Sequence, residues 1–115
     1  MIVKEVTVRG ISKEELFESL NNKLKEWENP IYTHKAQNLY AIFVERWFFR
    51  AQGNLMVSIL IEENKMTIIA GGGTGLGSAE SKAIKYVIRD LKELSKSKHF
   101  SFEEREEERI YEDPS

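Results

Sequence analysis

The sequence predicts a small α+β domain, a two-layer sandwich in which two helices cover one face of a four-stranded, mainly antiparallel sheet. Two segments with helical apolar spacing are separated by three consecutive strand-like runs, and one more strand-like run comes first. The predicted element order is therefore β-α-β-β-β-α. We expect the domain to occupy residues 1–95, and residues 96–115 to form a charged tail that is flexible or loosely helical.

The N-terminal part of the chain predicts a strand followed by a capped helix. Residues 2–9 alternate weakly in hydropathy, and Gly10 ends the run. Ser12 and Glu15 have the spacing of a capping box, which predicts a helix over residues 13–28. Its apolar side chains recur at helical spacing and are Leu16, Phe17, Leu20, Leu24 and Trp27.

The middle of the chain predicts three antiparallel strands. Residues 31–38 have no clear period and are predicted as a loop or an irregular strand entry. Strands are expected over residues 39–50, 55–62 and 65–70, and a two-residue turn at Glu63-Asn64 sets the register of the last two. That register makes one charged pair and one apolar face, through Glu62 with Lys65, Ile61 with Met66, Ile59 with Ile68 and Val57 with Ala70.

A second helix is predicted from Ser78 to about Leu94, and the charge of the chain gathers beyond it. Residues 95–115 carry a net charge of −3, whereas the whole chain carries −2. The body of the domain is thus nearly neutral, which makes a nucleic-acid partner unlikely because phosphate binding needs a concentrated basic surface. The apolar stripe of this helix consists of Ala83, Ile84, Val87, Ile88, Leu91 and Leu94.

Composition limits the classes of protein to which the chain can belong. A chain of 115 residues with 41% hydrophobic residues can bury a single core. It has no cysteine, which excludes a disulfide scaffold, a thiolate zinc site and a cysteine nucleophile. The sequence begins without the long apolar core of a signal peptide and has no apolar run of membrane-spanning length, so we expect a cytoplasmic protein without a membrane partner.

The strand over residues 39–50 is apolar on both of its faces, and the loop at 51–54 decides which face is buried. An even loop length places Val44 and Phe48 in the core. An odd loop length exposes Tyr40, Ile42, Val44 and Phe48. With an even loop, the open face of the sheet carries Phe43, Trp47, Phe49, Met56, Leu60 and Ile69.

Either register leaves large apolar side chains that the two helices do not cover. The favoured interpretation is a homodimer formed sheet to sheet. The alternatives are that residues 31–38 or the tail fold over this face, with Phe100 and Phe102 as candidates, or that it binds a small apolar ligand.

A glycine-rich loop at residues 71–77 precedes the last predicted helix. It lacks the lysine of a phosphate-binding loop and the spacing of a dinucleotide fingerprint. A helix N-terminus can still attract a small anionic ligand, whereas the alternative is a structural or mobile turn. The candidate ligand-binding residues are Gly72, Gly73, Thr74, Gly75, Gly77 and Ser78.

Candidates for catalysis are few. His34 and His99 are far apart in the sequence and have no nearby aspartate, so they predict neither a proton relay nor a metal cluster. The charged pair Glu45-Arg46 inside an aromatic strand is predicted as an ion pair at a sheet face, with a pocket as the alternative. No catalytic residue, metal or cofactor is predicted.

One stretch resembles a known family. Val44-Glu45-Arg46-Trp47-Phe48-Phe49-Arg50, then Asn54-Leu55-Met56-Val57-Ser58-Ile59-Leu60, and then Gly71-Gly72-Gly73, is similar to a family of small uncharacterised bacterial proteins, a domain of unknown function. The resemblance covers residues 40–75 and implies a compact α+β domain without an assigned activity. The predicted function is a non-enzymatic module for protein interaction or self-association, and the alternative is a small-molecule or anion binder that uses the glycine-rich loop.

Overall fold

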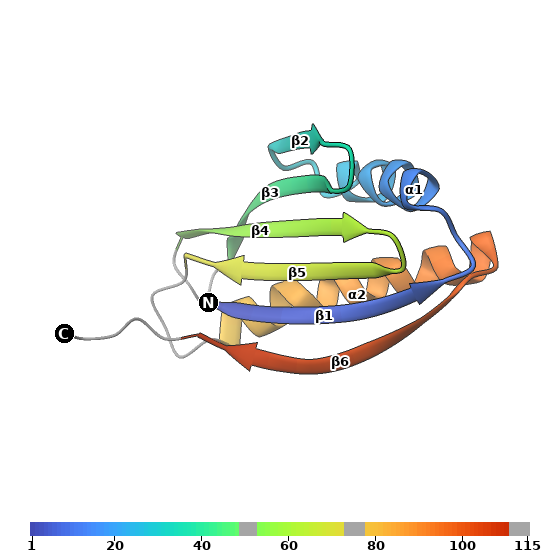
Figure 1. Ribbon diagram of the computed structural model, residues 1–115. Helices are drawn as coiled ribbons and strands as arrows, with labels where there is room; N and C mark the ends of the chain where they lie inside the picture. The colour runs from blue at the N-terminus through green and yellow to red at the C-terminus, as the bar shows by residue number, and fades with distance from the viewer. Residues whose placement is uncertain (49–52, 73–77, 111–115) are drawn as a thin grey trace.

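The computed structural model has two helices packed on one face of a six-stranded antiparallel sheet (Figure 1). It describes residues 1–48, 53–72 and 78–110. The α+β class and the two-layer arrangement are therefore confirmed. The elements are β1 (Ile2–Arg9), α1 (Lys13–Lys25), β2 (Ile31–Lys35), β3 (Tyr40–Phe48), β4 (Gly53–Glu62), β5 (Lys65–Gly71), α2 (Ser78–Lys98) and β6 (Ser101–Arg109).

The prediction of four strands is wrong, because the sheet has one additional strand at each edge. The strand order is β2-β3-β4-β5-β1-β6. Residues 31–35, predicted as a loop or irregular strand entry, pair with β3 as strand β2. Residues 101–109 fall in the predicted flexible or loosely helical tail, yet they pair with β1 as strand β6. Both strands are held mainly by backbone pairing, because their side chains are mostly exposed.

The core lies between the sheet and the two helices. Ser12 caps α1, since its Oγ accepts a hydrogen bond from the Glu15 backbone N–H at 3.1 Å, which confirms the serine half of the predicted capping box. From the sheet, alternate residues of β4 and β5 point into the core and are fully buried. The core side chains include Leu16, Phe17, Leu20, Leu24, Val57, Ile59, Ile61, Met66, Ile68, Ala83, Val87 and Leu91.

The predicted register of the β4–β5 hairpin is confirmed residue by residue. Glu62 pairs with Lys65, and the next apolar partners follow in step as predicted. Asn64 has φ 62°, the left-handed conformation that the tight turn requires. The Lys65 ammonium, however, lies 3.4 Å from the Glu5 carboxylate of β1. The predicted charged pair is thus one of backbone register, and the lysine forms its ion pair with the neighbouring strand.

The loop between β3 and β4 has the even length considered above. Phe48 pairs with Gly53, and four residues lie between them. Val44 is consequently fully buried beside Val57. Phe43, one residue earlier, belongs to the opposite face, which we call the open face because none of the described helices or strands packs over it (Figure 1).

The chain turns sharply between α2 and β6. His99 has φ 58°, and the N–H of Phe100 donates to the C=O of Ser95 at 3.2 Å. This is the pattern of a Schellman C-cap, in which a left-handed residue ends the helix. Phe100 is then 8% exposed and seals that end of the core. β6 therefore starts from a fixed point and runs back along β1.

Candidate functional site

The open face is an ordered grid of side chains from all six strands. Reading across the sheet from β2 to β6, the pairings place four rows along the strands. The first row contains Glu45, Met56 and Gly71; the second contains Tyr32, Phe43, Ser58, Ile69, Val3 and Glu108; the third contains His34, Ala41, Leu60, Thr67 and Glu5; the fourth contains Glu62, Lys65, Thr7 and Glu103.

The middle of this grid is apolar, and we call it the apolar patch: Phe43, Met56, Leu60 and Ile69. Three neighbouring strands, β3, β4 and β5, supply it. Met56 is 42% exposed, and the other three members are partly buried. At one side the Tyr32 ring, 65% exposed, lies 6.1 Å from the ring of Phe43. The patch therefore presents an uncharged surface that reaches the edge of the sheet.

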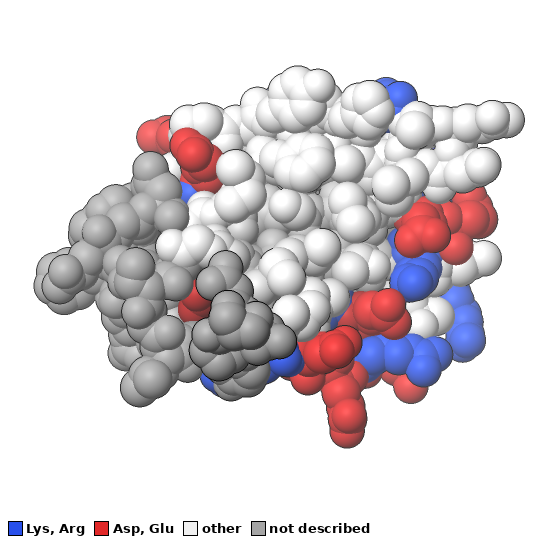
Figure 2. Space-filling model, turned by 60° about the vertical axis from the view of Figure 1, so that its left-hand side comes forward, with Lys and Arg blue, Asp and Glu red and all other residues white. Residues whose placement is uncertain are grey.

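Four of the six predicted interaction residues form the apolar patch. The backbone of Trp47 pairs with Asn54, and Phe49 lies outside the described residues. Figure 2 shows a broad uncharged surface, with acidic and basic side chains gathered at its lower right. Within the grid the charges follow the same division, because the fourth row and the β1–β6 side hold most of them.

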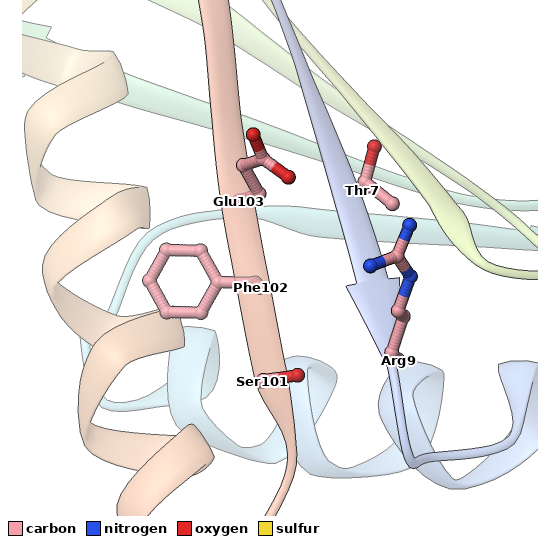
Figure 3. A pocket seen from close by; sticks show the side chains of 5 residues that line it. All are labelled: Thr7, Arg9, Ser101, Phe102 and Glu103. Carbon is pink, nitrogen blue, oxygen red and sulfur yellow. The ribbon is translucent and has the colours of Figure 1, made fainter.

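A small polar hollow of about 200 Å³ lies at the charged end of the open face, between β1 and β6. Figure 3 shows Thr7 and Glu103 on the same side of the two strands, whereas the Phe102 ring points away from them toward α2. Arg9 and Ser101 complete the lining, and both are exposed. The hollow is thus an exposed polar margin of the face, and none of its polar side chains is buried.

The predicted ligand-binding loop falls mostly outside the described residues. Gly73, Thr74, Gly75 and Gly77 belong to the segment 73–77. Gly72 is exposed and has φ 97°, a conformation that favours glycine. Ser78 is the first residue of α2, so the predicted helix start is confirmed. The anion-binding role of this loop stays a prediction.

The catalytic candidates do not come together. His34 is exposed on the edge strand β2, and Glu45 is exposed in the first row of the open face. His99 lies at the far end of α2. In the described part of the chain, no three histidine or acidic side chains are grouped to hold a metal ion. No described helix is long and apolar enough to cross a membrane.

The pair Glu45-Arg46 is split between the two faces of the sheet, so the predicted ion pair at one face is wrong. Strand alternation turns Arg46 toward the helices, away from Glu45. The Arg46 guanidinium lies 4.4 Å from the ring centre of Trp27 and 4.5 Å from that of Tyr86. It therefore links the end of α1 and the middle of α2 to the sheet through cation–π contacts.

A buried carboxylate completes this cluster. Asp90 is 4% exposed, and its Oδ2 accepts a hydrogen bond from Trp27 Nε1 at 2.9 Å. Arg89 Nε lies 3.8 Å from Oδ1. Burial raises the pKa of the Asp90 carboxyl above its ordinary value, and the Trp27 hydrogen bond opposes the rise. We call Trp27, Arg46, Tyr86 and Asp90 the arginine cluster.

A hollow of about 470 Å³ opens beside the arginine cluster, at the junction of α1, α2 and β3. Its remaining lining is charged and internally paired. Lys23 Nζ lies 2.6 Å from Glu93 and 3.6 Å from Glu26. Since three basic and three acidic side chains line it, the hollow has no net charge with which to select an anion or a cation.

The sequence contained a signal for this cluster that residue types alone did not reveal. Asp90 lies three residues after Val87 and seven after Ala83, so it falls on the apolar stripe of α2. An aspartate on such a stripe must find a donor or lose stability. The indole N–H of Trp27 supplies that donor from α1's end of the molecule. The partner could not be identified without knowing how α1 and α2 pack.

Asp90→Asn is expected to change how stability depends on pH. A carboxyl whose pKa is raised by folding favours the folded state below its unfolded pKa, and this contribution is lost as the pH rises through the folded pKa. Asparagine keeps an acceptor for Trp27 but does not titrate. The free energy of unfolding of Asp90→Asn, relative to wild type, should therefore rise between about pH 4 and about pH 7. Urea unfolding across this range measures it, and a flat or falling difference contradicts the assignment.

Comparison with models of known protein families gives no match, and no curated protein matches the chain. The resemblance of residues 40–75 to a family of small uncharacterised proteins therefore stays a prediction.

Proposed function

We propose that this protein is an interaction module that associates with a second copy of itself through the open face, and that it works by binding rather than by catalysis. The observation that carries the proposal is the apolar patch. Phe43, Met56, Leu60 and Ile69 lie together on three adjacent central strands, with no described layer over them. Contiguous apolar surface of this kind is typical of interaction sites.

The difference between the two sheet faces supports this choice of surface. On the helix side, residues such as Ile59 and Ile68 are completely buried. On the open side, their neighbours Leu60 and Ile69 remain accessible. An antiparallel sheet that is covered on one face normally carries polar side chains on the other. An apolar centre on the uncovered face is therefore better explained by a partner than by the needs of this fold.

A second copy is a suitable partner because the face is self-complementary in kind. Apolar side chains lie at its centre and charged ones lie toward the margin, which is the usual arrangement of a protein interface. Two sheets packed face to face interdigitate such side chains at a spacing of about 10 Å. Association then buries the patch of each copy against the other.

The wild-type protein is expected to be a dimer whose population depends on concentration. Light scattering or sedimentation between about 1 and about 500 μM should show the mass rising from 13.4 kDa toward twice that value. Salt should weaken the association little, since its main contribution is apolar. A mass that stays at 13.4 kDa over the whole range would contradict the proposal.

A further inference from the structure

The apolar patch alone is too small to hold two copies together. Strands are spaced by about 4.8 Å, and same-face residues by about 6.8 Å along a strand. Three strands and three rows therefore cover about 300 Å² in each copy, or about 600 Å² in two. A stable interface buries about 1,200–2,000 Å², so the contact must extend into the charged fourth row. The arrangement of the two copies then depends on how those charges match.

The fourth row holds one acidic and one basic side chain on the two central strands. Glu62 of β4 is partly buried, and among the described residues no basic nitrogen lies within 4.0 Å of its carboxylate. Lys65 of β5 lies directly opposite in the register but reaches Glu5 of β1. Its side chain is still 46% exposed and has donors left for a second carboxylate.

We infer that the two copies pack with their two-fold axis parallel to the strands, between β4 and β5. The inference rests on the proposed function, because it requires the open face to be the interface. In this arrangement β4 of one protomer lies over β5 of its partner. Glu62 then faces the partner's Lys65, and symmetry repeats the pair. Ser58 faces the partner's Ile69, and Phe43 faces the partner's Val3.

The other two-fold arrangement matches the charges poorly. An axis perpendicular to the strands lays each strand over its own copy. β6, with five glutamates and two arginines, would then cross the β6 of the partner, at a net charge of −3 on each. If that axis lies midway along the four rows, it also places Glu62 opposite the partner's Met56. Like charges and an unpaired carboxylate against an apolar group both disfavour this geometry.

The inference makes Glu62 and Lys65 the residues that determine specificity, and charge reversal tests it. Glu62→Lys alone and Lys65→Glu alone each place like charges across the interface twice. Each variant should dimerise at least about tenfold more weakly than wild type. An equimolar mixture restores opposite charges, because the lysine introduced in one chain faces the unchanged or introduced carboxylate of the other at one of the two symmetry-related contacts. The mixture should dimerise within about threefold of wild type, as measured by sedimentation or by fluorescence transfer between labelled chains.

A matched pair of variants controls for net charge. Glu15→Lys and Lys85→Glu make the same charge changes at exposed helix positions and should leave dimerisation unchanged, alone or mixed. Circular dichroism checks that every variant is folded. If a charge variant is unfolded, single cysteines can be used, since the chain has no others. A short thiol cross-linker should then join Glu62→Cys to Lys65→Cys in the mixture, and neither variant to itself.

The outcomes separate the inference from the proposed function. Reversal variants that dimerise as wild type, or a mixture that does not recover, overturn the arrangement while the open face stays the interface. Cross-linking of Glu62→Cys to itself overturns it as well. A wild-type protein that is monomeric at all concentrations overturns both.

Discussion

Leu60→Lys is expected to leave the protein monomeric at concentrations where the wild type is a dimer. Leu60 lies in the third row on β4, in the apolar patch. In a two-fold interface the substitution occurs twice, so two ammonium groups must be desolvated against apolar neighbours. At about 1.5 kcal/mol for each, the dissociation constant should rise at least about a hundredfold.

The fold itself should tolerate this change. Leu60 is partly exposed in the single chain, so a lysine can bury its stem and keep its ammonium in water. Asn22→Lys, at an exposed position of α1 on the opposite layer, adds the same charge and should leave the dissociation constant unchanged. Sedimentation of both variants makes the comparison. Dimerisation of Leu60→Lys at wild-type strength would remove the open face as the interface.

Trp27→Phe is expected to cost about 1.5–3 kcal/mol of folding stability at neutral pH, the range for a hydrogen bond to a charged group. Phenylalanine keeps an aromatic ring near Arg46 but cannot donate to Asp90. The buried carboxylate then depends on Arg89, whose Nε lies 3.8 Å from Oδ1. The melting temperature should fall by roughly 10 °C.

A double-mutant cycle separates this hydrogen bond from the loss of indole packing. In an Asp90→Leu background, Trp27→Phe removes the same ring surface but no bond to a carboxylate, so its cost should be smaller by about 1 kcal/mol or more. Chemical unfolding followed by circular dichroism supplies all four free energies. Equal costs in the two backgrounds would show that the Trp27–Asp90 bond does not stabilise the fold.

The central part of the fold could be predicted from sequence because its signals are local. The Glu63-Asn64 turn fixes the register of β4 and β5, and a one-residue slip would turn the whole apolar set of Ile59, Ile61 and Met66 to the wrong face. The edge strands had no such signal. In β6 only Phe102 is partly buried, and glutamate disfavours strands, so its pairing with β1 depends on tertiary structure.

The open face and the arginine cluster differ in the same way. The apolar patch follows from alternation along strands once the β3–β4 loop length is known, and the sequence already limited that length to two cases. The arginine cluster joins Trp27, Arg46, Tyr86 and Asp90, which are distant in the sequence and carry no motif. Only the packing of both helices on the sheet brings them together.

The place of β1 in the sheet has a consequence for how the protein is made. β1 is synthesised first, yet it lies between β5 and β6, and β6 is the last of the described strands to leave the ribosome. Until residues 101–109 emerge, one side of β1 is an unpaired edge next to an otherwise formed sheet, open to pairing with another chain. The backbone N–H of Ile110, which donates to the C=O of Met1 at 2.9 Å, marks the end of that exposure. The acidic strand, which the sequence predicts as a tail, thus closes the sheet.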